Sequence, residues 1–160
     1  MPKSRIDSAE KMIQASPDTI YHAFIHPQSM IQWLPPTGMS GQIDLFEPYK
    51  NGRYQFTLTY ENSATSLGKT SKNTDVSKGF FLELVPDQKI VMAGIFDSDD
   101  PKFAGEMIQT WYFEAVDEGT KVIIICENVP EGIGKKDHMT GLNSTLNNLA
   151  NFTERIGKNE

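Results

Sequence analysis

Histidines are the side chains in this sequence best suited to metal or acid–base chemistry. His22 and His26 are four residues apart, so a helix would place both on one face, where a metal ion could bridge them. His138 is the only other histidine, and no carboxylate stands in a recognised metal-binding motif. Because metal sites typically need three or four protein ligands, the sequence predicts no metal site. We expect His22 and His26 to be partly exposed surface residues.

The single cysteine, Cys126, lies in the apolar run 122–126. A reactive thiol needs an electropositive and open setting, so this run predicts an inert, buried thiol. One cysteine also excludes an internal disulfide, which fits a reducing compartment. We therefore expect a cytoplasmic protein.

Acidic and polar residues of the strand-like runs give no catalytic pair. Glu106 and Glu114 alternate away from Trp111, so they should face solvent. Gln109 shares the face of Trp111 and could either anchor a ligand's oxygen or lie near a wet mouth of the sheet, and Arg53 is a second candidate for an inward polar group. No nucleophile–base pair and no glycine-rich phosphate loop can be identified. The sequence predicts no catalytic residue and no cofactor, and leaves open whether any catalysis occurs.

Length and charge restrict the classes of partner. With 160 residues, a single domain over 1–160 is expected. The net charge is -6 and the 15 Lys and Arg residues are scattered, which disfavours both nucleic acid and an anionic membrane surface. The N-terminal residues carry no apolar signal core, and no apolar run reaches membrane-spanning length.

Local patterns predict the elements that must position these residues. A strand is expected within residues 3–15, a helix from Pro17 to about His26 with Ser16 as its N-cap, and a second short helix over 28–34. Strands follow near 42–45, 53–60, 74–85, 90–96, 105–116 and 120–128, with a hairpin turn at Asn51-Gly52 and loops at 61–73 and 97–101.

A long closing helix is expected from about Lys135. Its apolar residues recur at gaps of three and four, which is one narrow stripe on a helix: Met139, Leu142, Leu146, Leu149, Thr153 and Ile156. Since no other long helix is present to cover this stripe, the helix must lie across a curved sheet, an arrangement that often leaves a pocket. The outward face is predicted to be Ser144, Thr145, Asn147, Asn148 and Asn151. Phe152 lies off the stripe, and it either packs on an edge or contacts a second subunit, which makes a homodimer one expectation.

The order of elements and several segments resemble a known superfamily. The segments are 16–18 leading to 30–34, 52–56, 80–91, 119–122, 127–130, and 137–149 with its Asp137-His138, Gly141 and leucine stripe. Together they resemble the helix-grip fold of the START and birch-pollen-allergen superfamily, SRPBCC, in the branch named for the activator of the ninety-kDa heat-shock protein's ATPase. The resemblance implies an α+β fold with a curved antiparallel sheet of about six or seven strands, two short helices near the N-terminus, and a cavity between the sheet and the C-terminal helix.

The resemblance does not imply one activity, because members are similar to lipid or hormone carriers, polyketide cyclases, chaperone co-factors and stress proteins. We expect a protein that binds a small hydrophobic or amphipathic ligand in the cavity. A chaperone co-factor or stress-related interaction module is the alternative, and a cyclase or hydrolase acting on an aromatic substrate is a third reading. The predicted ligand-binding residues are Met30, Trp33, Tyr54, Phe56, Met92, Phe96, Met107, Gln109, Trp111, Phe113, Met139, Leu142, Leu146 and Leu149.

Overall fold

The computed structural model describes residues 5–35, 38–60, 74–96, 98 and 100–158. Its elements in chain order are β1 (Ile6–Ile13), α1 (Pro17–Ile25), α2 (Pro27–Trp33), β2 (Met39–Phe46), β3 (Arg53–Tyr60), β4 (Thr74–Val85), β5 (Lys89–Phe96), η1 (Pro101–Phe103), β6 (Met107–Val116), β7 (Gly119–Glu127) and α3 (Lys135–Lys158). The expected α+β helix-grip fold is confirmed. The predicted loop at 61–73 lies outside the described residues.

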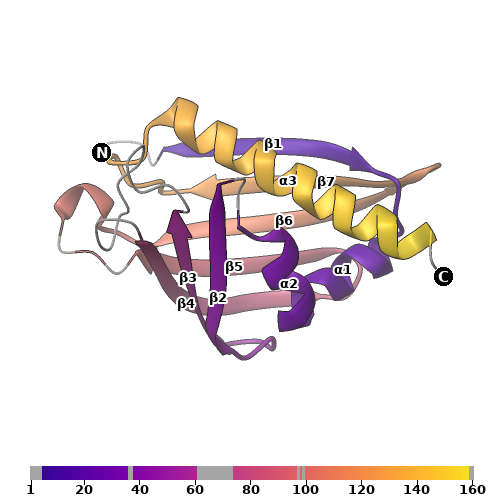
Figure 1. Cartoon of the computed structure of the whole chain (residues 1–160), viewed down its shortest axis with the longest axis horizontal. Helices are drawn as coiled ribbons and strands as arrows, with labels where there is room; N and C mark the ends of the chain where they lie inside the picture. The colour runs from indigo at the N-terminus through magenta and orange to yellow at the C-terminus, as the bar shows by residue number, and fades with distance from the viewer. Residues whose placement is uncertain (1–4, 36–37, 61–73, 97, 99, 159–160) are drawn as a thin grey trace.

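The strands form one seven-stranded antiparallel sheet in the order β1-β7-β6-β5-β4-β3-β2. Consecutive strands are neighbours from β2 to β7, and β1 joins the far edge beside β7. The sheet is curved, and all three α-helices lie on its concave side (Figure 1). Pairing brings Ile6 opposite Glu127 and Ile13 opposite Thr120, so the first and last strands of the sequence share one edge.

Local sequence explains where the short helices begin. The Ser16 hydroxyl accepts a hydrogen bond from the backbone N–H of Thr19, and Pro17 takes the first helical position of α1, where its missing N–H costs nothing. Pro27 takes the first helical position of α2, one residue before the predicted start, and the N-cap residue His26 makes no side-chain cap hydrogen bond. Trp33 closes α2, and its indole N–H donates to the carbonyl of Ala23 at 2.9 Å, which locks the two helices together.

The hairpin between β2 and β3 depends on Asn51 and Gly52, as predicted. Asn51 has φ +67°, a left-handed conformation that asparagine tolerates. A Cβ on Gly52 would collide with the backbone carbonyl of Glu47, so only glycine fits this turn.

Helix α3 crosses the concave side obliquely and packs chiefly on β1 and on the two short helices. Leu146 and Leu149 are fully buried there, in the same core cluster as Ile13, Ile20 and Phe24. Two polar contacts fasten the same region, because Asn148 donates to the carbonyl of Pro35 at 2.9 Å and Glu154 accepts the backbone N–H of Gln14 at 2.9 Å. The predicted packing of the C-terminal helix across the sheet is present, and the contact is most extensive toward the β1 edge.

Phe152 lies within the core, with 7% of its surface exposed, and Arg155 lies over its ring at 6.0 Å. Of the two predicted roles for Phe152, packing within the chain is the observed one. No helix among the described residues is both long and apolar enough to cross a membrane.

Candidate functional site: a cavity under the first half of α3

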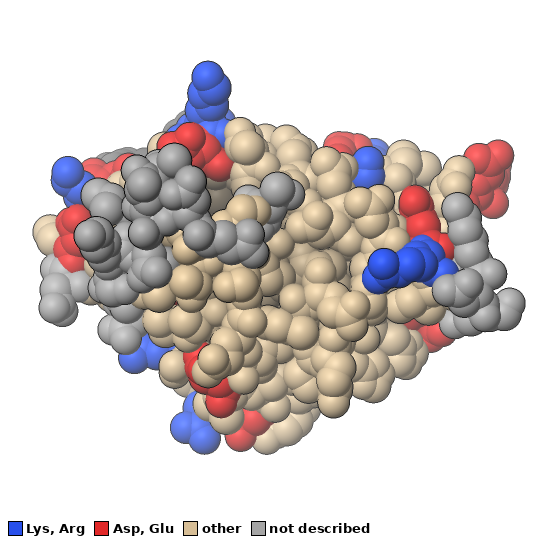
Figure 2. Space-filling model, viewed as in Figure 1, with Lys and Arg blue, Asp and Glu red and all other residues tan. Residues whose placement is uncertain are grey.

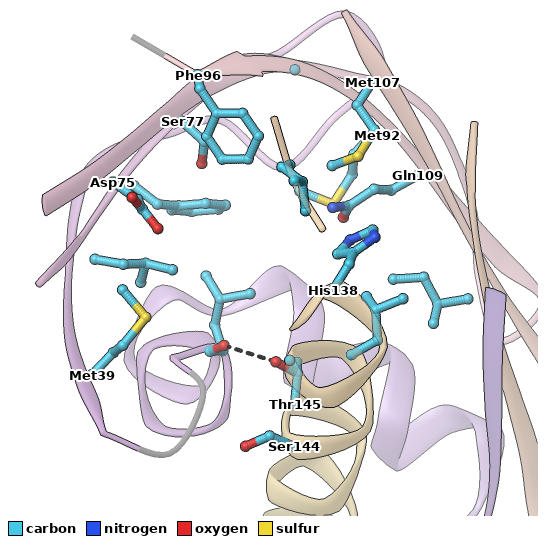
Figure 3. A pocket seen from close by; sticks show the side chains of 18 of the residues that line it. Met39, Asp75, Ser77, Met92, Phe96, Met107, Gln109, His138, Ser144 and Thr145 are labelled. Atoms are coloured by element: carbon cyan, nitrogen blue, oxygen red, sulfur yellow. Dashed lines mark hydrogen bonds between the residues drawn. The ribbon is translucent and has the colours of Figure 1, made fainter. Parts of the chain in front are cut away.

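A large cavity lies between the N-terminal half of α3 and the concave face of β2 to β6 (Figure 3). Its volume is about 1230 Å³, above the range of a few hundred to about 1,000 Å³ that is usual for small-molecule pockets. It exists because α3 packs against β1 and the short helices, which leaves the middle of the sheet uncovered.

The sheet supplies most of the apolar lining. Tyr54 and Phe56 come from β3, Met92 and Phe96 from β5, and Met107, Gln109 and Trp111 from β6, while Met30 of α2 and Leu142 of α3 complete this set. All of these residues are among those predicted from the sequence. Ligand binding by them stays a prediction.

The remaining predicted residues lie in the packed core and not on the cavity wall. Trp33 and Phe113 pack against Phe24, with ring centroids 4.6 and 5.3 Å apart. Leu146 and Leu149 of α3 are buried in the core, and Met139 of the same helix is partly buried against it. These residues miss the cavity wall because α3 buries its apolar stripe where it packs closely on β1 and the two short helices, and this contact lies beside the cavity.

The face of α3 that borders the cavity is polar. Ser144, Thr145, Asn147 and Asn148, which were expected to face outward, all line it. Thr145 is buried, and its hydroxyl donates to the carbonyl of Leu34 at 3.4 Å (Figure 3). Gly141 also lines the cavity, and a Cβ placed there would meet no atom within 4 Å. The cavity therefore combines an apolar sheet floor with a polar helical wall.

The strand side of the cavity carries a second polar group. Asp75 of β4 is only 5% exposed and lies opposite α3, with Ser77 beside it (Figure 3). Burial is the largest cause that raises the pKa of Tyr60, followed by the negative charges of Asp75 and Asp137 and then by a hydrogen bond with the Asp75 carboxylate. Leu58 and Tyr60 share the inward face of Tyr54 and Phe56, so strand alternation could have identified them.

His138 enters the cavity from the first turns of α3, held by a carboxylate that the sequence analysis missed. Its Nδ1 lies 2.6 Å from Oδ2 of Asp7, and the Asp7 side chain is completely buried. Arg5 pairs with the same carboxylate through Nη2 at 2.7 Å and Nε at 3.3 Å, and it donates through Nη1 to the carbonyl of Ile133. Lys135 Nζ is 4.0 Å from Asp7 Oδ1.

This environment lowers the pKa of Asp7 to about 2. The hydrogen bond from Arg5 is the largest cause, and His138 adds to it, whereas burial acts in the opposite direction. Asp7 is therefore ionised at neutral pH. Asp7 shares the inward face of β1 with Ala9, Lys11 and Ile13, so strand alternation by itself did not single it out as a buried carboxylate.

Other candidates from the sequence lie away from the cavity. Arg53 is exposed and pairs with Glu47 at 3.3 Å, so it is not an inward polar group. Glu106 and Glu114 are exposed, as expected. Cys126 is buried, and burial is the main cause that raises the pKa of its thiol to about 12, which makes it unreactive at neutral pH.

His22 and His26 stack with ring centroids 5.7 Å apart on the exposed side of α1. Within the described part of the chain, no three histidine, cysteine or acidic side chains come together as a metal site.

Residues 14–154 match the family model described as Activator of Hsp90 ATPase homolog 1-like protein. A crystal structure from Chromobacterium violaceum is similar at 26% identity and TM-score 0.82, covering 96% of this chain and 99% of that one. A crystal structure from Rhodobacter sphaeroides (19% identity, TM-score 0.73, covering 94% and 93%) and a solution structure from Staphylococcus epidermidis (18%, 0.70, 97% and 92%) share the fold. None of the curated proteins compared with the chain matches it.

Proposed function

The chain belongs to the family of Activator of Hsp90 ATPase homolog 1-like proteins, and from this premise we propose that it is a binding protein for a small amphipathic molecule. The ligand occupies the cavity between the first half of α3 and the sheet. The observation that carries this proposal is the cavity itself, about 1230 Å³ with an apolar floor and a few buried polar groups.

The distribution of groups in the cavity favours an amphipathic ligand over a purely apolar one. Aromatic and methionine side chains of β3, β5 and β6 offer a deformable apolar surface, and methionine adapts well to varied shapes. Gln109, Asp75, His138 and Thr145 add polar groups at defined points around it. The molecular face over α3 and the sheet is largely uncharged, with Lys, Arg, Asp and Glu mostly near its edges (Figure 2), so an apolar molecule would meet little charge on approach.

A substitution that fills the cavity tests the proposal. In Gly141→Leu, the new side chain starts in open space and extends into the cavity, so it should displace a ligand without straining the core. Loss of a helical glycine should at the same time favour α3. We expect an environment-sensitive apolar dye to bind the wild-type protein and to bind Gly141→Leu at least tenfold more weakly.

Asn151→Leu is the matched control, because it places the same side chain on an exposed position of the same helix, away from the cavity. It should bind the dye as the wild type does. Equal binding by Gly141→Leu and the wild type, with both variants folded, would place the dye elsewhere and remove the support for the cavity.

A co-chaperone role is the second candidate, and the outer face of the sheet favours it. Phe80 and Leu82 flank the buried Phe81 on β4, so they point outward, and both are exposed, as are Tyr112 of β6 and Met12 of β1. An apolar patch built around such side chains would be typical of a protein-interaction surface. Retention by the heat-shock protein in a pull-down should then fall in the double variant Phe80→Ser with Leu82→Ser and stay unchanged in Gly141→Leu. No retention of the wild type at low or high salt would remove this candidate.

A further inference from the structure

We propose that the hydroxyl of Tyr54 and the side-chain amide of Gln109 form one recognition site on the floor of the cavity, which selects amphipathic ligands that carry an uncharged carbonyl group. This inference rests on the proposed function, since it concerns a ligand in the same cavity. It adds the chemical class of the ligand's polar group and the two side chains that recognise it.

Glycines on two neighbouring strands determine where the Tyr54 hydroxyl lies. Tyr54 of β3 is opposite Gly79 of β4, and Gly79 is opposite Gly94 of β5. Because neither glycine carries a side chain, the tyrosine ring extends across β4, and its hydroxyl lies over Gly94, where an added Cβ would collide with it. Tyr54 and Gly94 both line the cavity, so the hydroxyl is held above β5, the central strand of the sheet.

The Tyr54 hydroxyl has no hydrogen-bond partner among the residues that the structure describes. The residue is only 7% exposed, yet no side-chain oxygen or nitrogen sealed from solvent lacks a partner in this part of the chain. The hydroxyl is therefore not enclosed in the core and opens to the cavity. A polar group that an apolar lining holds in place, and that the fold does not use, is available to a ligand.

Gln109 of β6 is a second polar side chain near the same point. Met107 of β6 pairs with Gly94, and Gln109 follows two residues later, so Gln109 is a diagonal neighbour of Gly94. Diagonal neighbours in antiparallel strands are about 7–8 Å apart, a gap that a glutamine side chain can bridge. Gln109 points into the cavity (Figure 3), and its amide makes no hydrogen bond to any described residue. A carbonyl oxygen of a ligand has two lone pairs, so it can accept from both donors.

Polar groups on the helical wall of the cavity differ from these two, because several are already engaged in the fold. Thr145 donates to the carbonyl of Leu34, and the Asn148 amide donates to the carbonyl of Pro35. A ligand that binds through the sheet floor leaves both contacts intact.

The charges near Tyr54 favour an uncharged acceptor. Burial is the main cause that raises the pKa of the Tyr54 hydroxyl, and the negative charge of Glu106 adds to it, so the hydroxyl keeps its proton and acts as a donor. Asp75 and Asp137 place two carboxyl groups in the cavity lining. These groups would repel a carboxylate or phosphate, and an ammonium group has no lone pair to accept from the hydroxyl. A ketone, ester or amide carbonyl meets both conditions.

The test uses the fluorescent ketone 6-propionyl-2-(dimethylamino)naphthalene and its propyl analogue, in which a methylene group replaces the carbonyl. Tyr54→Phe removes only the hydroxyl, so it should weaken binding of the ketone about fivefold, the size expected for one hydrogen bond. The propyl analogue should bind this variant as it binds the wild type. Gln109→Met should have the same selective effect. The emission of the bound ketone should move to shorter wavelength in both variants, because its carbonyl has lost a donor.

Tyr21→Phe is the matched control, because Tyr21 is 8% exposed, close to the 7% of Tyr54, and does not line the cavity. It should bind both compounds as the wild type does. Since the Tyr54 hydroxyl has no partner in the described part of the fold, Tyr54→Phe without ligand should unfold at the same urea concentration as the wild type.

Equal affinity of the wild type and Tyr54→Phe for the ketone would overturn the recognition of a carbonyl while leaving the cavity as a ligand site. An equal loss for the ketone and its propyl analogue would also overturn it, since the hydroxyl would then serve the shape of the cavity and not a hydrogen bond to the ligand. Failure of both compounds to bind the wild type would count against the cavity itself, and so against the proposed function and this inference together.

Discussion

At the level of single residues, Asp7 is a buried group through which pH acts on the fold. Its folded pKa of about 2 lies below its ordinary value of 3.8, so folding favours the ionised form. The resulting stabilisation is fully present above about pH 4 and is lost as the pH falls toward 2. A difference of this size corresponds to about 2 kcal/mol.

Asp7→Asn should therefore lower the free energy of unfolding at pH 7 by about 2 kcal/mol or more, since Arg5 also loses its partner. Between pH 5 and 2.5 the variant should lose less stability than the wild type. Urea unfolding at the two pH values measures both effects. Asp18→Asn, on an exposed aspartate, should change neither quantity by more than about 0.5 kcal/mol. An identical acid dependence in Asp7→Asn and the wild type would show that Asp7 does not carry it.

At the level of elements, the Ser16 cap is the feature on which the start of α1 depends. Its hydroxyl satisfies one of the backbone N–H groups that the first helical turn leaves without a partner. Ser16→Ala should lower the free energy of unfolding by about 1 kcal/mol, and Ser16→Asp should retain most of the stability. Denaturant unfolding of the two variants provides the comparison, and equal stability of alanine and wild type would mean that the cap contributes little.

The elements themselves were largely readable from the sequence, because their signals are local. The Asn51-Gly52 turn, the Ser16-Pro17 start and the three-four spacing of Leu142, Leu146 and Leu149 each act within a few residues. The short 3₁₀ turn η1, at residues predicted to lie in or beside a loop, was the element missed.

The cavity wall was harder to predict. Periodicity indicates which residues share a face of an element, but it does not indicate where the helix and the sheet leave a space between them. Leu146 and Leu149 were expected on the wall and lie in the core, whereas Thr145 and Asn148 were expected outside and line the cavity. The contact between Asp7 and His138 joins residues far apart in sequence, so no local pattern could have paired them.

At the level of the whole molecule, ligand binding should be visible as stability. A ligand that binds only the folded state at a hundred times its Kd adds about 2.7 kcal/mol, which for a chain of this length corresponds to roughly 5 to 10 °C in Tm. Differential scanning calorimetry with a saturating amphipathic compound measures this shift. Gly141→Leu should show no shift with the same compound, and a wild-type Tm that ignores every compound screened would count against a binding role.

The pairing of β1 with β7 has a kinetic consequence. These strands come from opposite ends of the sequence, and α3 packs on the same edge. Closing such a long loop costs entropy before any contact repays it. The hairpins from β2 to β7 can assemble early from neighbours along the chain, whereas the β1 edge must wait for distant partners. Refolding should accordingly be slow for a chain of this size, with docking of the two ends as the late event.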